Sequence, residues 1–161
     1  MKTDIPRRIL MAEDVLSDVE MVERELHKKA HREKEESEKE LIAIYENAPL
    51  IMVLLDGERR LHKVNGCTAT FSGRSADAMR LMRCGEALHC VNALASPEGC
   101  GLGEHCEQCI IRRSVAETLE TGKSFHQVEG ALSYMSEFRA GKMTFLLSTM
   151  KLHFNKQPLV L

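Results

Sequence analysis

Four cysteines fall within twenty residues of this 161-residue chain, in the segment CVNALASPEGCGLGEHCEQC, residues 90–109. Nine, five and two residues separate them in chain order: Cys90, Cys100, Cys106 and Cys109. Several thiolates on one loop can enclose a metal. In a reducing compartment, clustered cysteines bind a metal or take part in thiol chemistry more often than they form structural disulfides. The cluster therefore predicts a metal site or a reactive thiol.

The residues around the last two cysteines favour a metal. Cys106 and Cys109 form a C-x2-C pair, and Cys109 is placed to open a helix whose free N–H groups and positive end stabilise thiolates. Arg112 and Arg113 add positive charge one turn later, which suits a negatively charged thiolate cluster. Three glycines would let the loop bend round a bulky centre and aim backbone N–H groups at sulfur: Gly99, Gly101 and Gly103.

The spacing of the cysteines leaves the identity of the metal open. Structural zinc sites often use two C-x2-C pairs, whereas this loop has one pair and two single cysteines. Scattered ligands of that kind fit a four-iron cluster at least as well. Covalent c-type haem is excluded, because Ile110 stands where a histidine would follow Cys109.

Two histidines adjoin the cysteines and offer weaker alternatives. His89 and His105 precede Cys90 and Cys106, so they could bind haem or activate a thiol for nucleophilic chemistry. A histidine in a polar loop is usually solvated, and side chains that are neighbours in sequence usually point apart. We therefore expect neither role.

Cys67 and Cys84 are left out of the predicted ligand set. Cys67 sits in NGCTATF, beside an expected helix start, where a cysteine usually acts as a small buried hydrophobe. Five residues separate Cys84 from Cys90, so Cys84 could replace Cys90 as a ligand or take over on oxidation. We place Cys84 outside the site, and the predicted ligands are Cys90, Cys100, Cys106 and Cys109.

Composition narrows the class of protein. A chain of 161 residues with a formal net charge of −2 has room for one domain with an appendage, and it has no basic field to attract nucleic acid. No run approaches the ~18 apolar residues of a membrane span, and the N-terminus lacks the cleavage site of a secreted protein. We therefore expect a cytoplasmic protein with neither nucleic acid nor a membrane as partner.

A long helix is predicted over residues 1–47, ahead of the domain that holds the cysteines. Its middle, HKKAHREKEESEKE, is a solvated stretch of mixed charge. On either side, apolar residues step by four and three, which is typical of a coiled-coil seam: Val15, Val19, Val22 and Leu26, then Leu41, Ile44 and Ala48. A helix this polar buries too little surface to be stable alone, so we predict a dimeric coiled coil.

Residues 48–161 are predicted to form one α+β domain. PLIMVLLDGERRLHKVN indicates two antiparallel strands joined at an Asp-Gly turn, and Ser75 can cap a short helix that follows. CEQCIIRRSVAETLETGKS predicts a helix that stops at Gly122. Three closing strands are predicted in SFHQVEGALSYM, GKMTFLLSTMKLHF and QPLVL.

This order of elements resembles a PAS domain. The match runs from Tyr45 to Leu161, and AIYENAPLIMVLLDGERRLHKVN resembles the PAS entry, with a signalling helix, an Asn-Ala-Pro joint and the first two strands. The resemblance implies a five-stranded antiparallel sheet with helices on one face. It also implies a dimer that senses a ligand or cofactor and signals through flanking helices.

The cysteine-rich loop, residues 84–109, narrows the resemblance. GEALHCVNA followed by GCGLGEHCEQCIIR is similar to a cysteine-bearing subset of PAS domains in bacterial sensor kinases, whose cysteines are regarded as iron-sulfur ligands. The resemblance implies a [4Fe-4S] cluster, with zinc as the alternative metal. Its ligands would be the four cysteines of the predicted set: Cys90, Cys100, Cys106 and Cys109.

The N-terminal stretch carries a second resemblance. RRILMAEDVLSDVEMVERELHKKA is similar to the first strand and helix of a response-regulator receiver domain, in which Glu13 and Asp14 would be the acidic pair that binds magnesium. No later strand ends in a phosphoacceptor Asp or a partner Lys, so the sequence lacks the residues that phosphoryl transfer requires. We interpret the stretch as a remnant that serves as helix.

These features together predict a cytoplasmic PAS sensor, rather than an enzyme, that reports redox state or oxygen. A homodimer formed through the N-terminal helix would pass the signal to a histidine kinase or another output domain. The alternative is a zinc-stabilised PAS-like interaction domain, in which the metal only holds the loop together.

Overall fold

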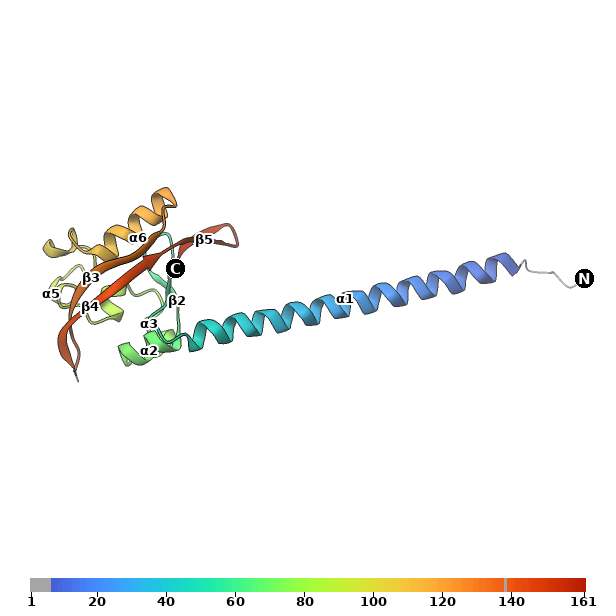
Figure 1. Ribbon diagram of the computed structural model, residues 1–161, viewed down its shortest axis with the longest axis horizontal. Coiled ribbons are helices and arrows are strands. Elements are labelled where there is room, and N and C mark those ends of the chain that lie inside the picture. The colour runs from blue at the N-terminus through green and yellow to red at the C-terminus, as the bar shows by residue number, and fades with distance from the viewer. Residues whose placement is uncertain (1–6, 138) are drawn as a thin grey trace, which may run out of the picture. The chain divides into compact units, whose positions relative to one another are not determined.

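The computed structural model describes residues 7–137 and 139–161, and Figure 1 shows their helices and strands. The chain divides into two compact units, Met1–Ile44 and Tyr45–Leu161. Within the described residues no helix is long and apolar enough to span a membrane.

One helix, α1 (Arg7–Asn47), makes up the described part of the first unit, and its last turn belongs to the second. Its 41 residues include neither Gly nor Pro, and it ends before Pro49, which disfavours helix in the residue ahead of it. Opposite charges pair along it, as between Lys29 and Glu33 at 3.8 Å, and each such exposed pair adds only about 0.3 kcal/mol. The helix predicted for this region is confirmed.

The receiver-like start forms no strand. The backbone is already helical at Arg7, so RRILM belongs to α1. Glu13 and Asp14 lie in the same helix, and their side chains fall outside the described ones. The described apolar residues of the predicted seam lie at the surface of the single chain, with Val22 57% and Leu26 59% exposed. The dimer stays a prediction.

The strands of the second unit pair in two antiparallel groups. One sheet has the order β2-β1-β6-β5, and the other is the β3-β4 hairpin. The bounds of the strands are β1 (Val53–Leu55), β2 (Leu61–Val64), β3 (Phe125–Met135), β4 (Ala140–Thr149), β5 (Lys151–Phe154) and β6 (Gln157–Val160).

The predicted single sheet of five strands is divided at Met150. That residue alone separates β4 from β5, so the segment predicted as one strand over residues 141–154 is one strand with a bend. At the bend, Met150 and Leu161 exchange two backbone hydrogen bonds of 3.0 Å. The bend places β4 in the β3-β4 hairpin and β5 in the four-stranded sheet.

Short helices connect the two groups of strands. They are α2 (Gly66–Ser72), α3 (Ala76–Met79), α4 (Cys84–Ala87), α5 (Val91–Ala95) and the 3-10 helix η1 (Glu104–Cys106). The longer α6 (Ile110–Thr121) packs along the β3-β4 hairpin, as Figure 1 shows. The predicted caps are confirmed: Ser75 accepts a hydrogen bond from the Ala78 N–H, and Gly122 ends α6 with a φ of 79°.

The core lies where β1, β2 and β6 meet α3, α4 and α6. Each element contributes at least one residue that is less than 5% exposed: Leu55, Leu61, Val64, Met79, Ala87, Val115 and Val160. The helices that carry these residues thus cover the sheet and shield its apolar side chains from water. The cysteine loop is built against this core, because Cys84 packs on the cluster from the start of α4.

The entry to the domain is held by Asn65, which is 1% exposed and caps α2. Its Nδ2 donates to the carbonyls of Ala48 and Leu50, at 3.2 and 2.9 Å. Its Oδ1 accepts from the N–H groups of Met52 and Thr68, each at 3.1 Å. The segment that leaves α1 is therefore fastened to the corner between β2 and α2 by one amide.

Candidate metal site

A cavity of about 70 Å³ is lined by all the cysteines of the region. They are the four predicted ligands together with Cys84: Cys84, Cys90, Cys100, Cys106 and Cys109. The sequence spacing places Cys84 outside the predicted ligand set, but in the structure Cys84 lines the same cavity as the four predicted ligands. Cys67 is not among the lining residues; it lies in α2 and is partly exposed.

The cysteines reach the cavity from the ends of short elements. Cys84 is the first residue of α4, and Cys90 precedes α5 as its N-cap. Cys106 ends η1 and is 5% exposed, and Cys109 is the N-cap of α6 as predicted. The positive end of the twelve-residue α6 therefore faces the side of the loop where Cys109 lies, which favours a thiolate there.

Cys100 approaches the backbone of α4 closely. The Gly85 N–H donates a hydrogen bond to Cys100 Sγ across 3.3 Å. A Cβ at position 85 would lie 2.7 Å from that sulfur and 3.2 Å from Ala93 Cβ. Only glycine leaves room for this contact, so residue 85 decides where the thiol of Cys100 can lie.

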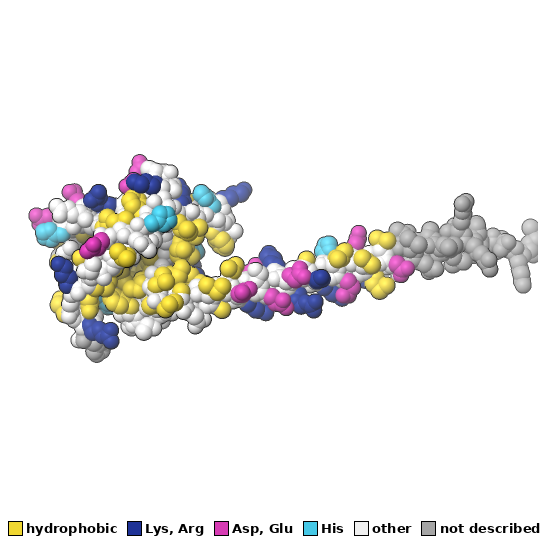
Figure 2. Space-filling model, viewed as in Figure 1, with side chains coloured by type: hydrophobic (Ala, Val, Ile, Leu, Met, Phe, Trp, Pro, Cys, Tyr) yellow, Lys and Arg dark blue, Asp and Glu magenta, His cyan; other side chains and the backbone are white. Residues whose placement is uncertain are grey.

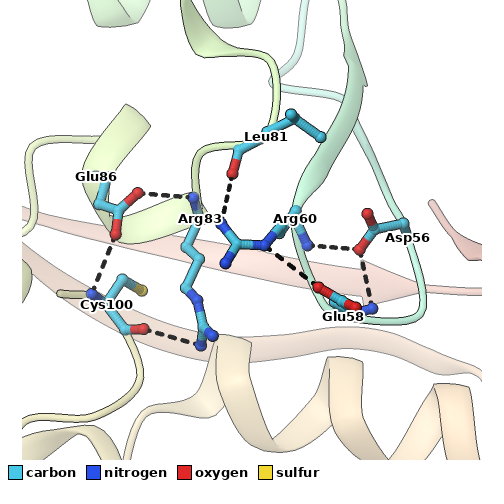
Figure 3. A network of polar contacts seen from close by, with 7 residues as sticks. All are labelled: Asp56, Glu58, Arg60, Leu81, Arg83, Glu86 and Cys100. Atoms are coloured by element: carbon cyan, nitrogen blue, oxygen red, sulfur yellow. Dashed lines mark hydrogen bonds and ion pairs between the residues drawn. The ribbon is translucent and has the colours of Figure 1, made fainter. Parts of the chain in front are cut away.

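Glu86 fastens the backbone of the cysteine loop, as Figure 3 shows. Its carboxylate accepts from the Arg83 N–H at 3.0 Å and from the Cys100 N–H at 3.4 Å. The Arg83 guanidinium in turn donates to the Cys100 carbonyl across 3.2 Å. Both backbone polar groups of Cys100 are thus bound by the N-terminal turn of α4.

The same figure shows a second set of contacts, in the loop between β1 and β2. Asp56 Oδ1 accepts from the N–H groups of Glu58 and Arg60, each at 2.9 Å, and Arg60 donates to the Leu81 carbonyl at 3.0 Å. The Asp-Gly turn predicted here is a longer loop, and its left-handed residue is Arg59, with a φ of 62°. Arg59 also lines the thiol cavity.

Cys90 and the preceding residue, His89, are held in place by contacts with β3 and with Ser72 at the end of α2. The His89 carbonyl accepts from the Met135 N–H at 2.9 Å, and Cys90 forms a bridge with Tyr134 of β3. The His89 ring lies 2.9 Å from the Ser72 carbonyl through Nε2. Neither His89 nor His105 lines the cavity, so the arrangement offers no histidine to a metal there.

Among the residues that the structure describes, the charged ones that line the cavity are Arg59, Arg83 and Arg112, with no Asp or Glu beside them. The Arg112 Nε is buried and has no hydrogen-bond partner among the described residues. Arginines without neighbouring carboxylates favour a negatively charged group, such as a set of thiolates on a metal.

Without a metal, the thiols at this site resist ionisation. Burial, with smaller effects from Cys100 and Cys109, raises the pKa of the Cys84 thiol to about 12. Burial also raises the pKa of Cys100, although the hydrogen bond from Gly85 opposes the shift. A metal that binds here must therefore displace protons from the thiols.

The donor set fits a metal centre, although the sulfurs do not converge on one point. In residues 7–137 and 139–161 no group of three or more His, Cys, Asp or Glu side chains is arranged to hold a single metal ion. Zinc needs four sulfurs at about 2.3 Å from one ion, whereas a four-iron cluster takes one thiolate on each iron.

A larger apolar cavity, of about 530 Å³, adjoins the thiol cavity. Strand β4 contributes more of its lining than any other element, and the segment that precedes β1 adds to it. The residues that line both cavities include Cys84 and Ile111. Figure 2 shows hydrophobic side chains gathered over the folded unit, and exposed ones include Leu50, Leu146 and Phe154. Sequence periodicity did not predict this cavity, because its walls come from segments that are far apart in the sequence.

No protein-family model matches this chain, and no curated protein does. Among solved structures, the PAS domain of an HTR-like protein from Haloarcula marismortui is similar, with a TM-score of 0.54 at 15% identity over 83% of this chain and 93% of that one. The PAS domain of nitrogen regulation protein NR(II) from Vibrio parahaemolyticus gives a TM-score of 0.48 at 12% identity, over 74% and 90%. The first likeness shows that the chain has a PAS fold.

Proposed function

We propose that this PAS-fold protein is a sensor that holds a [4Fe-4S] cluster and reports redox state or oxygen. Cys90, Cys100, Cys106 and Cys109 would be the ligands. One observation supports the proposal above the others: five cysteines and three arginines from separate segments line a single cavity, and no carboxylate is found among its described lining residues. Such a cluster supplies one-electron redox chemistry when bound.

The residues of the chain would hold and tune the centre. The N-terminal end of α6 and the Gly85 N–H stabilise negative charge on sulfur, and Glu86 keeps the backbone of Cys100 in place. Cys84, which lines the same cavity, would be a thiol that does not ligate the cluster. The apolar residues around the cavity limit the access of water and lower the local dielectric constant.

A change at the thiols would reach the sheet through α6. That helix begins directly after Cys109, and its Thr118 hydroxyl lies 2.7 Å from the Thr149 hydroxyl of β4. Oxidation or loss of the centre would alter the order of the cysteine loop and of the first turn of α6. The two states of α6 would then favour different arrangements of β4.

The output would be a change in the dimer formed by α1. Exposed apolar residues along α1 suit a second copy of the helix, and Asn65 fastens the segment that follows α1 to the domain. We place the sensor in the cytoplasm, with a histidine kinase or another output domain as its partner. In this proposal the protein is not an enzyme, and it binds neither nucleic acid nor a membrane.

Anaerobic metal analysis tests the proposal. Protein purified without oxygen should be brown, with broad absorption at about 400 nm and about four iron and four sulfide ions per chain. Colourless protein with one zinc ion per chain would overturn it in favour of a zinc-stabilised interaction domain. Protein that takes up neither metal, after reconstitution with iron and sulfide, would also overturn it.

A further inference from the structure

Three arginines line the thiol cavity from separate parts of the sequence. Arg59 belongs to the loop between β1 and β2, Arg83 is the N-cap of α4, and Arg112 is the third residue of α6. Within the described part of the chain, no carboxylate lines the cavity with them. A negatively charged group would therefore be the favoured occupant beside these arginines.

Arg83 and Arg112 differ in how their donors are used. Arg83 Nη1 donates to the Cys100 carbonyl at 3.2 Å, and Arg112 Nη1 donates to the Cys106 carbonyl at 3.5 Å. The Arg112 Nε, in contrast, is buried and has no partner among the described residues. A buried donor without a partner is costly, so its presence at the cavity indicates an acceptor that is not a protein group.

The position of Arg112 puts this donor beside the ligand loop. A Cβ built at Gly101, which follows Cys100, would lie 3.9 Å from Arg112 Cδ and 4.0 Å from Nε. The same Cβ would lie 3.2 Å from Arg83 Nη1. The two arginines thus approach the same glycine, next to the sulfur that already accepts a hydrogen bond from Gly85.

We infer that Arg112 donates its Nε–H to a sulfur of the metal centre and raises both the affinity and the reduction potential of that centre. The inference rests on the proposed function. Arg112 is a tuning residue, because it acts through the sulfur and does not ligate the metal. A fixed cation and an N–H donor stabilise the more negative, reduced state, and so their removal should lower the potential.

Neighbouring Arg113 provides a matched control. It carries the same charge one position further along α6, it is exposed, and it does not line the cavity. Arg112→Gln removes the charge and the Nε donor, whereas Arg112→Lys keeps the charge and changes the geometry of the donor. Thermal unfolding of the metal-free variants, followed by circular dichroism, establishes that each is folded.

The first measurement is the midpoint potential of the reconstituted, anaerobic full-length protein. Arg112→Gln should change the ratio of reduced to oxidised centres at a fixed potential by about tenfold, which is a fall of ~59 mV for a one-electron couple. Arg112→Lys should fall between that variant and the wild type, and Arg113→Gln should match the wild type. Equal potentials for Arg112→Gln and Arg113→Gln would overturn the inference and leave the proposed function intact.

The second measurement needs no iron. Co²⁺ added to the reduced, metal-free full-length chain forms thiolate complexes that absorb strongly, so its affinity is measured by titration. Arg112→Gln should bind Co²⁺ about tenfold more weakly than Arg113→Gln, because a cobalt-thiolate complex is also anionic. Equal affinities would again overturn the inference. A further outcome is that the two variants differ tenfold in Co²⁺ affinity while the wild-type chain takes up no iron and sulfide. That pair of results would overturn the proposed function but support the role of Arg112.

Discussion

The Gly85 N–H and the Cys100 sulfur lie 3.3 Å apart and are joined by a hydrogen bond. Fourteen residues separate the two positions in the sequence, and they meet because Glu86 and Arg83 bind the backbone of Cys100. This contact connects the first turn of α4 to the middle of the predicted ligand set. It also shows that one position without a side chain determines whether the thiols can share a cavity.

Substitution of Gly85 by alanine should disrupt the site. The new Cβ would lie 2.7 Å from Cys100 Sγ, so the sulfur must move, and the cost should be about 1–3 kcal/mol in the free energy of unfolding. The metal content of anaerobically reconstituted protein should fall severely. Gly57→Ala is the control, because no atom lies within 4 Å of its Cβ position. Full metal content in Gly85→Ala would contradict the role given to this contact.

Serine substitutions separate the ligands from the other cysteines. A hydroxyl is rarely deprotonated near neutral pH, so variants of Cys90, Cys100, Cys106 and Cys109 should lose the centre or hold it poorly. Cys67→Ser should keep it, because Cys67 does not line the cavity. Cys84→Ser decides the ligand set: an empty site in this variant together with a filled site in Cys90→Ser would exchange those two residues. Iron and sulfide analysis of each variant provides the measurement.

Tyr45 should titrate far above the usual range of a tyrosine. Burial, and then the charge of Glu46, raise its pKa to about 12. The unfolded chain loses this proton near pH 10, so the contribution of Tyr45 to stability is present below pH 10 and is lost as the pH rises from about 10 to 12.

Absorbance of the phenolate at 295 nm measures the titration of Tyr45 directly. The chain has two tyrosines and no tryptophan, so Tyr134→Phe leaves Tyr45 as the only chromophore of this kind. The midpoint should lie at about 12. Glu46→Gln should lower it. A midpoint at the ordinary value of a tyrosine would show that Tyr45 is solvated in the protein.

Asn65→Ala should destabilise the domain by about 3 kcal/mol, because the carbonyls of Ala48 and Leu50 and the Thr68 N–H lose this partner, and the Met52 N–H keeps only the Thr68 hydroxyl. Urea unfolding of the metal-free protein measures the loss. The control is Thr70→Ala, also in α2, where the exposed hydroxyl bonds only within its own helix and the change should stay within about 0.5 kcal/mol. Similar stabilities for the two variants would show that the amide does not fasten the entry segment.

Charge on the predicted seam should prevent dimer formation. Val22 and Met21 are both 57% exposed on α1, but only Val22 belongs to the seam. Val22→Lys should therefore be monomeric in analytical ultracentrifugation, while Met21→Lys should sediment as a dimer with the wild type. A monomeric wild type, or equal behaviour of both variants, would reject the coiled coil.

Local patterns in the sequence were sufficient for most of the elements. The absence of Gly and Pro from residues 7–47 determined α1, and Ser75 and Gly122 marked helix ends that the structure confirms. Alternating apolar residues predicted the closing strands. Such features act between residues a few positions apart, so they can be read along the chain.

Other properties depended on contacts between distant segments. Cys84 joined the thiol cavity because α4 packs beside the loop that carries Cys100, and the bend at Met150 divided the sheet. Arg59, Arg83 and Arg112 form one cationic lining only after β1, α4 and α6 have come together. Sequence distance says little about such through-space relationships, because they are set by how the apolar faces of all the elements are buried at once.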